Sequence, residues 1–148
     1  MRWFPTAIVL VASTACASAP VVRDVENLAN YRGVSFTEAW DLVVGEFASR
    51  NWTIENLDRD SGAITSEWTS AENDSYRDCG SAGFRANFNN YQGRFNVTVR
   101  ETDDGVAVTV NSSWQVTRNS ANSIGIVPCL STGVMERDFH RALRRRGL

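Results

Sequence analysis

One stretch of this 148-residue chain alternates apolar and polar residues more regularly than any other. It reads GRFNVTVRETDDGVAVTVNSSWQV, residues 93–116, with apolar side chains at every second position on both sides of Asp103-Asp104-Gly105. Successive side chains of a strand point to opposite faces, and a short Asp/Gly segment between two such runs is typical of a hairpin turn. The stretch therefore predicts a β-hairpin whose apolar face must be buried against a second layer.

A second hairpin is predicted by WTIENLDRDSGAITSEW, residues 52–68. Its turn is Asp58-Arg59-Asp60-Ser61-Gly62, in which we expect Gly62 to adopt the left-handed conformation that other residues reach only at a cost. The residues expected on its apolar faces are Trp52 and Ile54 on the first strand, and Ile64, Ser66 and Trp68 on the second.

Two segments with helical periodicity flank the hairpins. In residues 35–51, Ser35 and Glu38 have the spacing of a capping box, which satisfies free amides at a helix start. In residues 131–148, Ser131 or Thr132 is expected to cap a second helix. The two apolar stripes are Phe36, Trp40, Val43, Val44 and Phe47, and Val134, Met135, Phe139, Ala142 and Leu143.

The order of these elements predicts an α+β fold. We expect an antiparallel four-stranded, or slightly larger, sheet with two helices packed on one face, in the order α-β-β-β-β-α. Residues 69–92 are expected to form a long loop or an irregular strand, and residues 117–129 a loop. The core is expected to include Trp40, Trp52, Trp68 and Trp114.

The N-terminus has the outline of a signal peptide. A positive start is followed by an apolar run from Phe4 to Ala12 and by small residues up to Ala19, and the run is too short to span a membrane. An ordinary signal peptidase would cut after Ala17 or Ala19. Alternatively, Ser13-Thr14-Ala15-Cys16 resembles the lipobox of bacterial lipoproteins, with Ser13 where that motif usually has Leu.

We favour the lipoprotein scheme, which divides the chain into three parts. Residues 1–15 are then a lipoprotein-type signal peptide, residues 16–34 a lipidated Cys16 followed by a tether, and residues 35–148 a single α+β domain. The later part of the tether, Val25 to Val34, is expected to touch the domain.

The cysteine count fits either scheme of export. Of the three cysteines, Cys16 is lipidated in one scheme and can be removed with the signal peptide in the other, which leaves Cys79 and Cys129. In an oxidising compartment these predict one disulfide, which the chain-entropy model credits with roughly 4 kcal/mol. Without a C-x-x-C arrangement, a structural bridge is favoured over redox-active thiols.

Charge argues against a nucleic-acid partner. Without the signal peptide and its Arg2, the chain carries 14 arginines, no lysine and 17 acidic residues, a formal charge of −3. The cluster Arg144-Arg145-Arg146 could bind lipid headgroups or nucleic acid, but cations at a helix C-terminus are favoured by the helix dipole, and we prefer that interpretation.

No catalytic, cofactor-binding or metal-binding residue is predicted. The single histidine, His140, is expected at the surface, and CGSAGF at residues 79–84 matches neither a P-loop nor a nucleophile elbow. The remaining candidates are interpreted as turn residues without calcium-loop spacing: Asp58, Asp60, Asp103 and Asp104.

Residues 36–68, FTEAWDLVVGEFASRNWTIENLDRDSGAITSEW, resemble a pattern of small Gram-negative envelope lipoproteins. The pattern is similar to the helix-grip domains of BamC, a lipoprotein of the outer-membrane β-barrel assembly machinery, and of related lipoproteins. CLSTGVMER likewise resembles a recurring helix start in such lipoproteins, with Cys129 at a disulfide position. The resemblance implies fold-determining roles, as helix, hairpin and core positions, for Trp40, Trp52, Ile54, Asp60, Gly62 and Ile64.

These observations lead to two functional hypotheses. The first is an outer-membrane lipoprotein, held in the membrane through Cys16, whose non-catalytic domain faces the periplasm and binds or scaffolds an envelope protein partner, with a role in outer-membrane assembly implied by the resemblance. The second is a periplasmic carrier, soluble or anchored, of a small apolar ligand or lipid, because a helix gripping a curved sheet can enclose a cavity.

Overall fold

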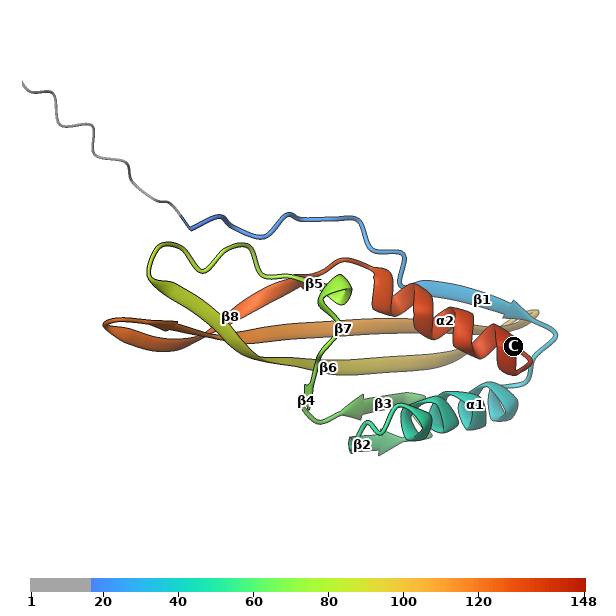
Figure 1. The fold of residues 1–148 in the computed structure, drawn as a ribbon. Helices are drawn as coiled ribbons and strands as arrows, with labels where there is room; N and C mark the ends of the chain where they lie inside the picture. Colours follow the sequence, from blue (N-terminus) through green and yellow to red (C-terminus); the bar gives the residue numbers. More distant parts are fainter. Residues whose placement is uncertain (1–16) are drawn as a thin grey trace, which may run out of the picture.

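The computed structural model describes residues 17–148, so the predicted signal peptide and Cys16 lie outside the described residues. The described part forms one antiparallel sheet in the order β2-β3-β6-β7-β8-β5, with β1 also paired to β7 and β4 to β6 (Figure 1). The elements are β1 Leu28–Arg32, α1 Phe36–Ser49, β2 Ile54–Asp58, β3 Ala63–Ser66, β4 Thr69–Ser70, the 3-10 helix η1 Asp74–Tyr76, β5 Arg77–Asp78, β6 Ala86–Thr102, β7 Gly105–Ser120, β8 Ser123–Ser131 and α2 Val134–Arg146.

Strands β6 and β7 form the long central hairpin of the sheet, as the alternation of their residues predicts. The two strands pair from Thr102↔Gly105 at the turn to Ala86↔Ser120 at the other end, with one irregularity between Asn89 and Gln92. Both strands are longer than the expected 93–116, because residues 86–92 pair with residues 115–120 at the open end of the hairpin. The apolar face consists of Phe95, Val97, Val99, Val106, Val108, Val110, Trp114 and Val116, all buried.

Both helices pack on this face, which confirms the α+β class. The predicted capping box starts α1, because the Glu38 amide donates to Ser35 Oγ at 3.3 Å and the Ser35 amide donates to Glu38 Oε2 at 3.1 Å. Helix α2 instead begins after Gly133, which has φ +77°. The expected caps assist from outside the helix, since Ser131 Oγ accepts from the Gly133 amide and Thr132 Oγ1 from the Val134 amide.

The β2–β3 hairpin forms as predicted, with β3 pairing to β6. Its turn glycine, Gly62, has φ +68°, and a Cβ at that position would clash with the Val99 carbonyl oxygen. Trp40 and Trp114 are buried and Trp52 packs against the core, as expected. The expectation for Trp68 is wrong: its side chain lies outside the core and is 38% exposed, because the chain bends between β3 and β4.

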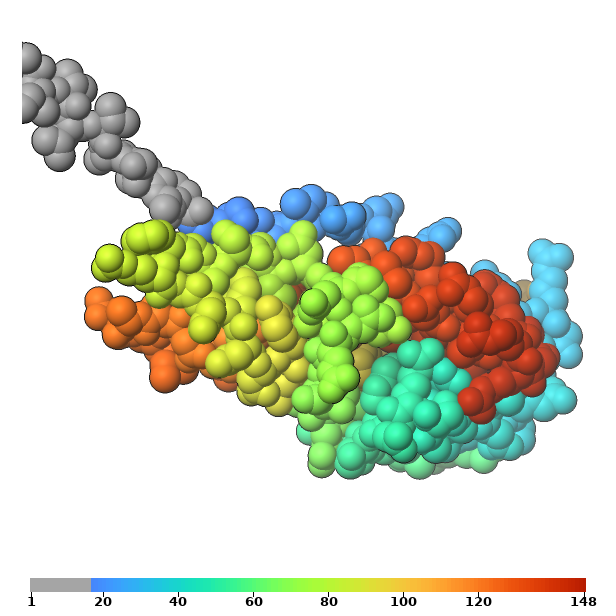
Figure 2. Space-filling model, in the orientation of Figure 1, coloured from blue at the N-terminus to red at the C-terminus, as the bar shows by residue number. Residues whose placement is uncertain are grey.

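The predicted sheet of four or slightly more strands is too small, because the described residues form eight strands. Residues 69–92 contain β4, β5 and the start of β6. This segment crosses the helix-covered face, from β4 beside β6 to β5 beside β8 (Figure 1). Residues 69–92 and the two helices together cover this face of the sheet, as Figure 2 shows. Tyr76, between β4 and β5, places its ring 6.0 Å from that of Trp114.

Two further strands lie in segments expected to lack regular structure. Residues 117–129, expected to be a loop, instead complete β7, turn at Ala121–Asn122 and form most of β8. The expected tether of residues 16–34 contains β1, which pairs with β7 from Leu28↔Thr109 to Arg32↔Gly105. The described residues that precede β1 lie along the surface of the domain (Figure 2). No helix within residues 17–148 is long and apolar enough to cross a membrane.

Candidate partner-binding site

Strand β8 lies at an edge of the sheet for most of its length. It pairs with β7 from Ser123 to Cys129, but on its other side β5 reaches only Leu130 and Ser131. Among the described residues, no backbone hydrogen bond is made to the outer side of Ser123–Pro128. Because alternate residues of a strand direct their N–H and C=O groups to each side, this edge offers a row of free donors and acceptors.

The side chains on this edge are unusually apolar for a solvent-exposed strand. Ile124 and Ile126 are 77% and 68% exposed. Natural edge strands are usually short or carry charged residues that prevent pairing with another chain. On β8 the only such protection is Pro128, which cannot donate a backbone hydrogen bond. The segment Ser123–Pro128, which we call the β8 edge, is therefore suited to receive another strand.

A shallow groove of about 510 Å³ adjoins the β8 edge on the face of the sheet away from the helices. Trp68 stands at one side of the groove, and Ile126 and Pro128 stand at the other. The polar floor between them includes Ser113 and Gln115 of β7. A side chain of an extended peptide paired to the β8 edge would meet the near side of this groove, formed by Ile126 and Pro128.

The predicted cysteine pair fixes the end of this edge. The sulfurs of Cys79 and Cys129 are at disulfide distance, with their Cα atoms 4.2 Å apart. The bridge joins the residue that follows β5 to β8. The loop before β6 is thus held beside β8.

A buried polar network, which sequence reasoning missed, holds β8 to α2. Glu136 is 1% exposed, and its carboxylate accepts hydrogen bonds from the hydroxyls of Ser112 and Ser131. Ser112 Oγ in turn accepts from Trp114 Nε1 at 2.7 Å. Glu136 lies in the first turn of α2, where the helix dipole favours an anion. The carboxylate is closed off from solvent, which suits a structural rather than a catalytic role.

The expectation that His140 lies at the surface is wrong. Its side chain is buried, with Nδ1 2.9 Å from the Tyr31 hydroxyl and Nε2 3.0 Å from the Asn27 carbonyl oxygen. When Nε2–H donates to that carbonyl, Nδ1 accepts from Tyr31. Burial lowers the pKa of His140, which keeps the ring neutral at pH 7. Burial also raises the pKa of Tyr31. The histidine joins α2 to β1 and to the residue before it.

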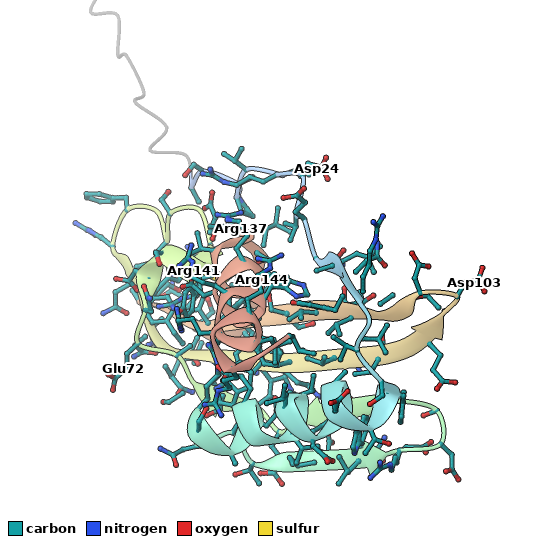
Figure 3. All side chains as sticks on the ribbon, turned by 90° about the vertical axis from the view of Figure 1, so that its right-hand side faces the viewer. Asp24, Glu72, Asp103, Arg137, Arg141 and Arg144 are labelled. Carbon is teal, nitrogen blue, oxygen red and sulfur yellow. A yellow bond between two sulfur atoms is a disulfide. The ribbon has the colours of Figure 1, made fainter. Side chains whose placement is uncertain are left out.

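The other polar candidates lie in turns or at a helix end. Asp58 Oδ1 accepts from the amides of Asp60 and Ser61. Hydrogen bonds from the Ser61 side chain, then from the Ser61 and Asp60 amides, lower the pKa of Asp58. Asp103 lies at the tip of the β6–β7 hairpin (Figure 3). Within residues 17–148, no group of three or more His, Cys, Asp or Glu side chains is arranged to hold a metal ion.

The arginines of α2 lie at its last turn and along its solvent side. The cluster Arg144-Arg145-Arg146 occupies the last turn, where the helix dipole favours cations, and Arg146 Nε lies 3.1 Å from Glu46 Oε2 of α1. Arg137 and Arg141 project with Arg144 from the solvent side of α2 (Figure 3).

The space where a carrier would hold a ligand is filled by aromatic side chains. Trp52 stacks on Phe95 with ring centroids 3.7 Å apart and on Phe139 at 6.0 Å. Phe47 meets both Trp52 and Phe139 edge to face. These rings come from α1, α2, β6 and the segment between α1 and β2, so they occupy the space between the helices and the sheet.

Neither the scan against protein-family models nor the search of curated proteins gave a match to this chain. The fold and the candidate site describe this chain as an α+β domain with a filled core and an open apolar sheet edge.

Proposed function

We propose that this chain is an outer-membrane lipoprotein whose domain faces the periplasm and binds a partner protein by strand addition at the β8 edge. One observation carries the proposal: within residues 17–148, the outer side of Ser123–Pro128 has no backbone partner and lies beside two exposed isoleucines. In strand addition, main-chain hydrogen bonds supply affinity and alternate side-chain pockets supply specificity. The side of the groove formed by Ile126 and Pro128 would serve as one such pocket.

The location in the envelope is supported by the sequence. The lipobox-like residues ending at Cys16 and the resemblance of residues 36–68 to envelope lipoproteins favour an anchored protein. The cysteine pair at disulfide distance fits an oxidising compartment. A role in scaffolding outer-membrane assembly follows from the same resemblance and is part of this proposal.

A carrier function receives less support because aromatic rings fill the space beneath the helices. A partner-binding role needs only the β8 edge and its groove, both of which are open to solvent. We therefore do not pursue the carrier as a second candidate.

Site-specific photo-crosslinking in a Gram-negative host tests the binding site. A photoreactive amino acid at Ile126 should give one discrete adduct of higher mass, and the same amino acid at Leu57, an exposed residue of the opposite edge strand β2, should give none. The further substitution Ile124→Lys should weaken the adduct at position 126 several-fold, since a charge on an edge strand opposes pairing. Equal adducts at positions 57 and 126 would exclude the β8 edge as the binding site.

The intact mass of protein from the membrane fraction tests the anchor. The proposal predicts a chain that begins at Cys16 and carries acyl groups. A chain that begins at Ser18 or Pro20 without lipid would contradict the anchor but leave the β8 edge to be tested by crosslinking.

A further inference from the structure

The first described residues lie against the domain instead of leading away from it. The Ser18 amide donates to Ser81 Oγ at 2.9 Å, and the Ser81 amide donates back to the Ser18 carbonyl at 3.0 Å. Three residues further on, the Val21 amide donates to Asp78 Oδ2 at 3.1 Å. This leader, residues 17–27, runs along the surface toward β1 (Figure 1).

The other end of the leader is fixed by the sheet and α2. The Asn27 carbonyl accepts from the Val110 amide at 2.8 Å and lies 3.0 Å from His140 Nε2. Asn27 Nδ2 also donates to Asn111 Oδ1 at 2.7 Å. Both ends of the leader are therefore held, so it cannot act as a free linker while these contacts last.

Glycines in the loop before β6 allow the leader to approach closely. Gly80 has φ +67°, and a Cβ at that position would clash with the Ser18 carbonyl oxygen. A Cβ at Gly83 would lie 3.3 Å from Ala17 Cβ. The backbone at Ala17, which follows Cys16 directly, is thus seated beside residues 80–83.

The two segments that meet at this point each carry exposed apolar and cationic side chains, and Asp24 is an exposed acidic residue beside them. Phe84, one residue beyond Gly83, is 73% exposed, and the Arg85 guanidinium lies 5.2 Å from its ring. On the leader itself Val21, Val22 and Arg23 are exposed. We call these five apolar and cationic residues the anchor-side patch. Exposed aromatic and aliphatic groups beside arginines are typical of surfaces that enter the headgroup region of a bilayer.

We propose that the docked leader holds the domain flush against the bilayer, with the anchor-side patch in the lipid interface. This inference rests on lipidation of Cys16, as in the proposed function. Consecutive Cα atoms are about 3.8 Å apart, so a lipid on Cys16 enters the bilayer within a few ångströms of Ala17. The proposed occupant of the patch is phospholipid, because a lipid on Cys16 would bring the bilayer to this end of the leader.

Lipid quenching of an added tryptophan tests the inference. The full-length lipidated protein would be reconstituted in phosphatidylethanolamine and phosphatidylglycerol vesicles with brominated acyl chains. Phe84→Trp should add a fluorescence component that the brominated lipid quenches at least twofold more than that of Leu57→Trp, a matched exposed site on β2. Equal quenching at the two sites would overturn the inference.

A glycine pair tests the role of the leader. Gly80→Ala in the Phe84→Trp background should reduce the extra quenching, because the new Cβ displaces Ser18. Gly33→Ala is the matched control, since Gly33 also has a positive φ of +70° but nothing lies within 4 Å of its Cβ position. Unchanged quenching in Gly80→Ala would show that the leader does not hold the domain.

The intact mass of the same preparation distinguishes failure of the lipid anchor from failure of the flush orientation. Acylated Cys16 without extra quenching at Phe84→Trp overturns only the flush orientation. Absence of acyl groups overturns the anchor and the inference together.

Discussion

His140 is the residue whose environment differs most from its expectation. Neither its position in α2 nor its neighbour Phe139 indicated a buried histidine, because its partners Tyr31 and Asn27 belong to a segment more than 100 residues away. A short-range pattern cannot anticipate a contact made by a strand that itself lacks a strong pattern.

The buried histidine predicts a pH dependence of stability. Burial lowers the folded-state pKa of His140 below the unfolded value of about 6.5, so the unfolded chain binds its proton first. Its contribution is fully present above about pH 6.5 and is lost as pH falls toward the folded pKa. The urea midpoint should therefore fall between about pH 7.5 and about pH 5 in the parent and fall less in His140→Gln. An equal fall in both proteins would contradict the assignment.

The buried carboxylate of Glu136 predicts a loss of stability when it is removed. Glu136→Ala leaves the hydroxyls of Ser112 and Ser131 without their buried acceptor, so we expect the free energy of unfolding to drop by about 1–3 kcal/mol. Glu136→Gln keeps the shape and one oxygen and should cost less. The control is Glu72→Ala, whose side chain is exposed. Chemical denaturation measures all three, and equal losses for Glu136→Ala and Glu72→Ala would refute a structural role for the network.

At the scale of helices and strands, short sequence patterns with a specific local geometry predicted the elements correctly. The capping box of α1, the Gly62 turn and the β6–β7 alternation each specify local geometry, and each appears in the structure. Strand β8 could not be predicted in the same way. Its isoleucines point away from the core, and Gly125 and Pro128 interrupt the run, so its pattern favours a loop. The pairing with β7 decides its structure.

The cysteine pair predicts how firmly β5 and β8 are held together. Replacing Cys79 and Cys129 by serine opens a loop of 50 residues, and the chain-entropy model puts the loss of unfolding free energy at roughly 4 kcal/mol. Denaturant unfolding should show a loss of that order, and amide exchange should accelerate first in β5 and β8. Unchanged unfolding free energy and exchange would mean that the bridge has no stabilising role.

For the whole molecule, the α+β layering was predictable but the extent of the sheet was not. Short strands such as β4 and β5 contain two residues each, which is too few for any periodicity to be seen. The cysteine count alone predicted the disulfide, whereas the β8 edge and its groove depend on Trp68, Ile126 and Pro128 meeting through the fold. The candidate site is thus a property of the assembled sheet.

Amide hydrogen exchange of residues 123–127 tests the central claim most directly. It would be measured in the isolated protein and in the complex captured through position 126. The outward amides of this segment should exchange rapidly in the isolated protein and become protected in the complex, because a partner strand then accepts their hydrogen bonds. Slow exchange in the isolated protein, or unchanged exchange in the complex, would contradict strand addition at the β8 edge.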